Sequence, residues 1–275
     1  MSNRWKAWII VMLLPLLGGC SALRLSYGQG PLLAYWWLNS QVDFSAEQAP
    51  RVRSALADYA QAVGELAAAT AGPVSPNQLC AQVESWQRRA ERAFDHAVPA
   101  LAEQLRSMSP EQIAHLERRQ AERQKELVAE RLPADPAERQ KAALTRSTDR
   151  AETLYGSLDE AQRQLLAAGL AASPFDTERW LAERSARTTE LLRSLRQWQA
   201  EQADSATVQA GLRRLAAETQ RSPRADYRAH SQRLLVANCA LFAQLHNSTS
   251  AAQRQRAAGK LQGWQADLRA LADSR

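Results

Sequence analysis

Cys20 stands in a sequence context that directs one particular chemistry to its thiol. The run Leu16-Leu17-Gly18-Gly19 precedes it, so small side chains lie directly before the cysteine. Small residues let a peptidase reach the backbone at this point, and the thiol can then carry a lipid through a thioether. Basic residues and the apolar stretch 7–17 come before this run, and that stretch is too short to span a bilayer comfortably. The pattern predicts a lipoprotein signal peptide over residues 1–19.

If Cys20 becomes the first residue of the mature protein, its thiol and its amine carry two or three acyl chains of the palmitate type. At about 0.8 kcal/mol per buried CH2 group, such an anchor is effectively permanent. Ser21 follows the cysteine, where an acidic residue would favour the inner membrane. We therefore expect a protein anchored by lipid in the outer membrane, with its domain facing the periplasm. The alternative is an uncleaved transmembrane anchor.

Two further cysteines remain, Cys80 and Cys239. An envelope location permits disulfide formation, so we predict that these two residues pair. On the chain-entropy account, a bond that closes a loop of about 160 residues stabilises the fold by roughly 4–5 kcal/mol. The alternative is a pair of buried, reduced thiols.

Known catalytic and metal-binding patterns do not occur in this sequence. It has no nucleophile elbow, no phosphate-binding loop, no dinucleotide fingerprint and no zinc-protease motif. No two histidines stand three or four residues apart, which argues against a helical metal face; they are His96, His115, His230 and His246. We therefore predict no catalytic residues, no metal and no cofactor. A hydrolytic site assembled from scattered residues is a further alternative.

The composition indicates a helical protein with a mixed-charge surface. Residues with high helix propensity, such as Ala, Leu, Gln, Arg and Glu, dominate, whereas Gly and Pro number only 11 each. The net charge is +6, with acidic and basic residues interspersed throughout the chain. Such a distribution is typical of solvated helix faces and does not indicate a nucleic-acid partner.

One short pattern, Ser or Asp followed three residues later by Gln, marks the start of successive helices. In this capping box, the Ser or Asp oxygen accepts a hydrogen bond from a free backbone N–H, and the Gln side chain reaches back to the cap residue. Pro76 and Pro110 occupy first helical positions, where the missing N–H costs nothing. The pattern occurs at Ser45–Gln48, Ser75–Gln78, Ser109–Gln112, Asp159–Gln162 and Ser250–Gln253.

These caps and the apolar stripes between them predict an all-α protein with short connections and no strands. We expect a single multi-helix bundle over residues 46–275, preceded by a lipidated and aromatic tether over residues 20–45. The predicted helices are 46–70, 76–107, 110–131, 136–155, 160–171, 177–203, 206–220, 223–247 and 251–272.

Residues 117–126 form a predicted helical segment that is polar all round. A helix without an apolar stripe projects into solvent, bridges two parts of a structure, or contacts a polar partner. The first interpretation is a solvated helix stabilised by Arg–Glu pairs. The second is a partner-binding surface, whose candidate residues are Arg118, Arg119, Glu122 and Arg123.

Residues 32–38 concentrate aromatic and apolar side chains close to the anchor. Trp and Tyr favour the bilayer interface, so Tyr35, Trp36 and Trp37 are candidates for membrane contact. The alternative is that these side chains complete the core of the helical bundle.

Several segments together resemble a family of Gram-negative lipoproteins that is catalogued only as a domain of unknown function. The resemblance covers essentially the whole mature chain and implies a helical envelope lipoprotein without an established activity. Besides the lipobox, it is carried by residues 23–27, 34–38, 42–48, 115–119, 135–139, 154–156, 172–176 and 245–247. A second resemblance links Met108–Gln112 to a motif of small periplasmic helical chaperones, and cap chemistry alone can produce that match.

We expect from these features a non-enzymatic, lipid-anchored module that binds an envelope protein. The alternative is a membrane-tethered periplasmic chaperone for unfolded or assembling envelope proteins, suggested by the repeated caps and the surface rich in Arg and Gln.

Overall fold

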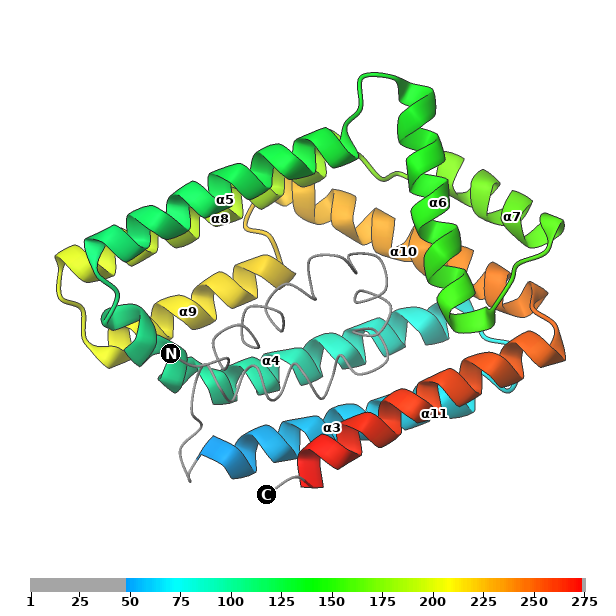
Figure 1. Ribbon diagram of the computed structural model, residues 1–275, viewed down its shortest axis with the longest axis horizontal. Coiled ribbons are helices and arrows are strands. Elements are labelled where there is room, and N and C mark those ends of the chain that lie inside the picture. Colours follow the sequence, from blue (N-terminus) through cyan, green and yellow to red (C-terminus); the bar gives the residue numbers. More distant parts are fainter. Residues whose placement is uncertain (1–47, 274–275) are drawn as a thin grey trace, which may run out of the picture.

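The computed structural model describes residues 48–273, which form nine α-helices and contain no strand (Figure 1). The all-α prediction is confirmed, and the helix ends lie within about three residues of those predicted. None of the described helices has the length and apolar character needed to cross a membrane. The helices are α3 (Gln48–Ala69), α4 (Pro76–Arg106), α5 (Pro110–Arg131), α6 (Pro136–Tyr155), α7 (Glu160–Ala171), α8 (Thr177–Ala200), α9 (Ser205–Gln220), α10 (Ala225–Ser248) and α11 (Ala251–Asp273).

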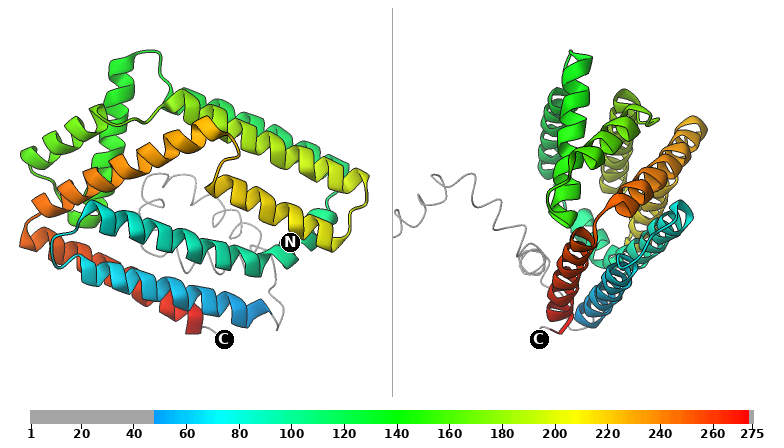
Figure 2. Two further views of the ribbon diagram at one scale, coloured as in Figure 1. Left: turned by 180° about the vertical axis from the view of Figure 1, so that it is seen from behind. Right: turned by 90° about the vertical axis from the view of Figure 1, so that its right-hand side faces the viewer.

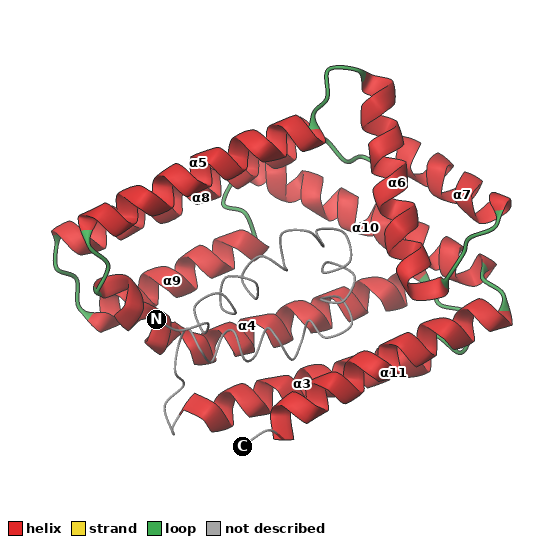
Figure 3. Cartoon of the chain, in the orientation of Figure 1, coloured by secondary structure: helices red, strands yellow, loops and turns green. Residues whose placement is uncertain are grey.

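The helices form an elongated frame in which distant parts of the sequence lie side by side (Figure 2). The first and last described helices, α3 and α11, pack against each other along one edge, and α5 and α8 pair along the opposite edge. Between these pairs, α4 contacts α3, α9 and α10. Helices α6 and α7 close one end of the frame, and short loops connect the elements (Figure 3).

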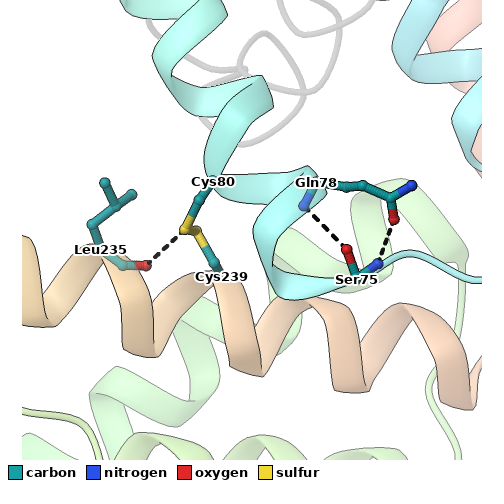
Figure 4. The surroundings of a disulfide bond; sticks show 5 residues. All are labelled: Ser75, Gln78, Cys80, Leu235 and Cys239. Carbon is teal, nitrogen blue, oxygen red and sulfur yellow. Dashed lines mark hydrogen bonds between the residues drawn. A yellow bond between two sulfur atoms is a disulfide. The ribbon is translucent and has the colours of Figure 1, made fainter.

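Four of the predicted capping boxes are present in the structure. At Ser75, the hydroxyl accepts from the Gln78 N–H at 3.2 Å, and the Gln78 side chain accepts from the Ser75 N–H at 2.7 Å (Figure 4). The same reciprocal bonds form at Ser109, Asp159 and Ser250. Ser45 lies outside the described residues.

The start of α10 departs from the sequence prediction. We expected a helix from Pro223, but α10 begins at Ala225, and its N-cap residue Arg224 makes no side-chain cap. The hydroxyl of Ser222 instead accepts from the Arg224 N–H at 3.2 Å, and Ser222 is buried with 3% of its surface exposed. The serine therefore stabilises the turn before the helix.

The apolar core consists of several clusters at the places where helices meet. Their central side chains are almost completely inaccessible: Val98 and Val208 are 0% exposed between α4 and α9, and Leu245 is 1% exposed at the end of α10. The cluster between α5 and α8 contains Ile113 and Leu195.

Helix α5 does not project into solvent as a whole, because its inner face packs along α8. Ile113 and Leu127 are buried near its two ends, and the half-buried Gln120 and Gln124 occupy the same face between them. The Gln124 side-chain amide donates to the Leu181 carbonyl of α8 at 3.5 Å. Glutamines at core-facing positions therefore hid this contact stripe from sequence analysis.

A disulfide joins Cys80 at the start of α4 to Cys239 in α10, as predicted (Figure 4). The two Cα atoms lie 5.7 Å apart, and the residues are separated by 159 positions in the sequence. The bond ties an early helix to a late one and so links the two halves of the frame.

Two capping-box glutamines, Gln162 of α7 and Gln253 of α11, also bond to each other. Each amide nitrogen donates to the other side-chain oxygen at 2.9 Å. In addition, Gln162 donates to the Ser248 carbonyl at 3.1 Å, and Gln253 donates to the Ser157 carbonyl at 2.9 Å. Both oxygens still accept from their own cap residues, so every hydrogen-bonding position of the two amides is used.

Removing the disulfide should lower the free energy of unfolding. Replacing both Cys80 and Cys239 by alanine is expected to cost roughly 2–5 kcal/mol in urea denaturation, because the unfolded chain regains the entropy of a long closed loop. Non-reducing mass spectrometry of the purified protein should show one peptide pair linked through these residues. Two freely alkylatable thiols would contradict the assignment.

The paired glutamines should contribute more than an ordinary helix cap. We expect Gln162→Ala to lower the free energy of unfolding by about 3 kcal/mol, because it removes a buried side chain together with its tertiary hydrogen bonds to Ser248 and Gln253. Gln112→Ala is the matched control: Gln112 closes the same capping box on α5 but is exposed. That change should cost about 1 kcal/mol or less. Equal losses in urea denaturation would show that the tertiary pairing contributes nothing.

Candidate functional site

A cleft of about 1210 Å³ lies between α4, α8, α9 and the start of α10. Its apolar lining includes Phe94, Trp180, Leu191 and Leu215, all of them half-buried. Charged residues of both signs surround this lining, among them Asp95, Glu183, Arg187, Glu190, Arg213, Arg214, Glu218 and Arg224. We call this feature the central cleft.

Close packing near the turn between α8 and α9 fixes how these two helices and α4 lie around the central cleft. A Cβ on Gly211 would lie only 2.2 Å from the ring of Trp198, so glycine allows α8 and α9 to approach closely beside their connecting turn. Val98 and Val208 hold α9 against α4. Away from the turn the ribbons of α8 and α9 separate (Figure 1). Residues of both helices line the central cleft.

Glu183 is the buried anchor at the open end of the central cleft, with 4% of its surface exposed. One carboxylate oxygen accepts from Arg187 Nε at 2.8 Å and the other from Arg224 Nε at 2.6 Å. Burial acts to raise the pKa of this carboxyl, but hydrogen bonds from Arg224, Ser222 and Arg187 outweigh it and hold the pKa below its usual value. The ionised group joins α8 to the turn before α10.

Glu190 makes a second charged connection across the central cleft. Its carboxylate accepts from Arg193 at 2.7 Å and from Arg214 of α9 at 3.1 Å. These hydrogen bonds and charges, led by the bond from Arg193, lower the pKa of Glu190 to about 2. Arg214 also donates to Glu218 at 3.0 Å, so one guanidinium bridges both walls.

The charged groups of the central cleft are arranged for structural pairing and do not show the features of an acid–base site. A general acid or base needs a pKa near the working pH, whereas Glu183 and Glu190 are both held ionised by arginines. Tyr227 lies beneath Arg187, whose guanidinium carbon is 5.7 Å from the ring centroid, and burial raises the pKa of Tyr227 further above its ordinary value. Within residues 48–273, no group of His, Cys, Asp and Glu could hold a metal ion.

A second polar cluster lies outside the central cleft, at the C-terminal end of α10. The Tyr155 hydroxyl is 3.0 Å from His246 Nδ1, and His246 Nε2 is 2.9 Å from the Gly72 carbonyl. The carbonyl can only accept, so Nε2 carries the proton and Nδ1 accepts from the tyrosine. Burial raises the pKa of Tyr155 to about 12. The histidine is thus a structural bridge between α6, α10 and the loop before α4.

Asn247 extends this cluster, because its side-chain amide bonds to both backbone groups of Val74. Its side chain accepts from the Val74 N–H and donates to the Val74 carbonyl, each at 2.9 Å. The segment 245–247, which carried part of the family resemblance, therefore supplies one core side chain and two polar bridges. The sequence showed His246 only as one of four histidines without a metal-binding spacing and gave no sign of these partners.

The four candidate partner-binding residues are all exposed on α5. Arg118 is exposed, and the side chains of Arg119, Glu122 and Arg123 are 69%, 58% and 55% exposed. Arg119 donates to Glu122 at 3.1 Å. Cys20, Tyr35, Trp36 and Trp37 lie outside the described residues.

A shallow hollow of about 460 Å³ adjoins these residues at the start of α5. Arg119 is both a candidate residue and part of this hollow, which connects the two features; the other lining residues are Met108, Glu111, Gln112, His115 and Leu116. We call the exposed face with its hollow the α5 outer surface.

Sequence analysis did not identify the central cleft, because its key pairs are long-range. Glu183 and Arg187 show the spacing of a helical ion pair, which is a common surface pattern. The partner that buries Glu183, Arg224, is 41 residues away and carries no local signal. Only the position of α10 against α8 brings the three side chains together.

Comparison with known proteins gives a single assignment. No curated protein and no solved structure matches the chain. A profile described as a family of unknown function, DUF6279, matches residues 44–228, which is more than half of the chain and includes α4, α8 and α9. The resemblance seen in the sequence is thereby confirmed at the level of the family, and the chain belongs to this family of unknown function, DUF6279.

Proposed function

We propose that the protein is a lipid-anchored binding module of the cell envelope, held in the outer membrane through Cys20 and facing the periplasm. In this proposal it has no catalytic activity and binds an envelope protein through the α5 outer surface. The Cys80–Cys239 disulfide supports this compartment, because structural disulfides persist in the periplasm and are rare in the cytosol.

The α5 outer surface is the observation that carries the binding proposal. It combines a partly apolar hollow at Met108 and Leu116 with a ridge of exposed charges. An apolar centre beside a polar rim is the usual anatomy of a protein interface. The inner face of the same helix is fixed against α8, so the surface is held rigid before a partner arrives, which lowers the entropic cost of binding.

The central cleft supports a binding role over an enzymatic one. Its most buried carboxylates are neutralised by arginines and bridge neighbouring helices. The capping boxes, which suggested a chaperone, serve in the structure as helix caps and as the joint between α7 and α11. These bonds account for the repeated motif without a client protein.

Anchoring through Cys20 predicts a specific loss on substitution. Wild-type protein expressed in Gram-negative cells should incorporate a clickable palmitate analogue and fractionate with the outer membrane. Cys20→Ser should lose the label and the membrane association, because no thioether can form and the remaining N-terminal apolar stretch is short. A labelled or membrane-bound Cys20→Ser protein would contradict lipid attachment at this residue.

Binding through the α5 outer surface predicts position-specific crosslinking in living cells. A photoreactive residue at position 119 or 123 should give one discrete adduct with an envelope protein. The same residue at the exposed position Gln262 on α11 should not give that adduct. Met108→Glu should lower the adduct yield from position 123, because it places a charge against the apolar part of the hollow. Equal adducts from positions 119, 123 and 262 would contradict a specific surface.

A further inference from the structure

The apolar lining of the central cleft is only partly covered by residues 48–273, because its side chains are half-buried and the space they border is open. Phe94, Trp180, Leu191 and Leu215 border a space of about 1210 Å³. Concave surfaces with an apolar lining are commonly binding sites. The occupant must cover aromatic and aliphatic side chains and leave the surrounding charges in place.

Most of the charges around the cleft are already paired with one another, which argues against an ionic occupant. Each of the carboxylates Asp95, Glu183, Glu190 and Glu218 accepts from an arginine that also lines the cleft. An acidic or basic ligand would have to displace these pairs. An uncharged, apolar segment would pack on the lining and leave them intact.

The chain itself contains such a segment a short distance before α3. Residues 32–38, with the sequence LLAYWWL, are all apolar or aromatic, and no Asp, Glu, Lys or Arg occurs from residue 25 to residue 42. Trp and Tyr cover large areas with little loss of side-chain freedom, which suits them to filling an open cleft.

The geometry of α3 places this segment within reach of the cleft. Asp58 of α3 pairs with Arg89 and Arg92 of α4, and the residues between those two arginines, Ala90 and Glu91, line the cleft. Helix α3 begins ten residues before Asp58, which is about 15 Å along the helix. The nine residues 39–47 can span about 30 Å when extended.

We propose that residues 32–38 bind in the central cleft of their own molecule, with Trp36 and Trp37 against the apolar lining. A short tether gives the segment an effective concentration in the millimolar range, which favours it over a free partner of similar affinity. The cleft is then filled by the segment that leads to Cys20, so the lipid anchor emerges from this side of the domain. The proposal is independent of the α5 outer surface.

Photocrosslinking within the lipidated full chain tests this docking. A photoreactive phenylalanine analogue replaces Trp37, cells are irradiated, and the purified protein is digested and mapped by mass spectrometry. The expected product has the mass of a single chain and joins position 37 to peptides of α4, α8 or α9 that line the cleft. Adducts with lipid, with a second copy, with another protein, or with parts of the same chain away from the cleft would overturn the proposal.

A pair of matched variants separates docking from chance contact. Ala90→Glu places a charge on the exposed edge of the cleft and should lower the yield of the cleft adduct by about tenfold, because an apolar segment would have to desolvate it. Ala81→Glu, on an exposed position of α4 that does not line the cleft, should leave the yield unchanged. Circular dichroism confirms that both variants fold. An unchanged yield in Ala90→Glu would overturn the proposal.

Discussion

The reciprocal bonding of Gln162 and Gln253 is the contact on which the closed end of the frame depends. A helix leaves unpaired N–H groups at its start and unpaired carbonyls at its end, and burying any of them without a partner is costly. Here two helix starts and two chain reversals meet at one point, where Ser248 and Ser157 contribute carbonyls. Each amide accepts from the N–H of one cap residue and donates to one of these carbonyls, and the two amides bond to each other, which joins the parts of α7 and α11 that meet there.

Neighbouring polar bridges extend this joint to the rest of the molecule. His246 and Asn247 connect the end of α10 to the loop between α3 and α4, and the disulfide adds a covalent link between α4 and α10. The long helices α4, α5 and α8 then extend from a fixed end. Helix α8 packs on α5 with one face and borders the central cleft with another.

The division between what could and could not be predicted from the sequence follows the range of each interaction. Helix starts at Ser75 and Asp159 were predictable because a capping box involves residues three positions apart. The disulfide was predictable because assigning Cys20 to lipid leaves one pair. The Gln162–Gln253 bond and the Glu183–Arg224 pair were not, since each joins residues that only the fold brings together. The sequence of α5 did not reveal its contact with α8, because Gln120 and Gln124 occupy contact positions that are usually apolar.

The polar residues at the end of α10 have a structural role that their types alone do not indicate. In the fold, the histidine of segment 245–247 lies beside Tyr155, and such residue types can form a reactive site. The tyrosine bonds to the histidine, and the histidine and Asn247 bond to backbone carbonyls of the loop between α3 and α4. Burial raises the pKa of Tyr155 to about 12. Polar residues so completely engaged specify how the helices meet. Within residues 48–273, the α5 outer surface and the apolar lining of the central cleft are less completely engaged, and both are therefore candidates for where this chain binds a further segment or partner.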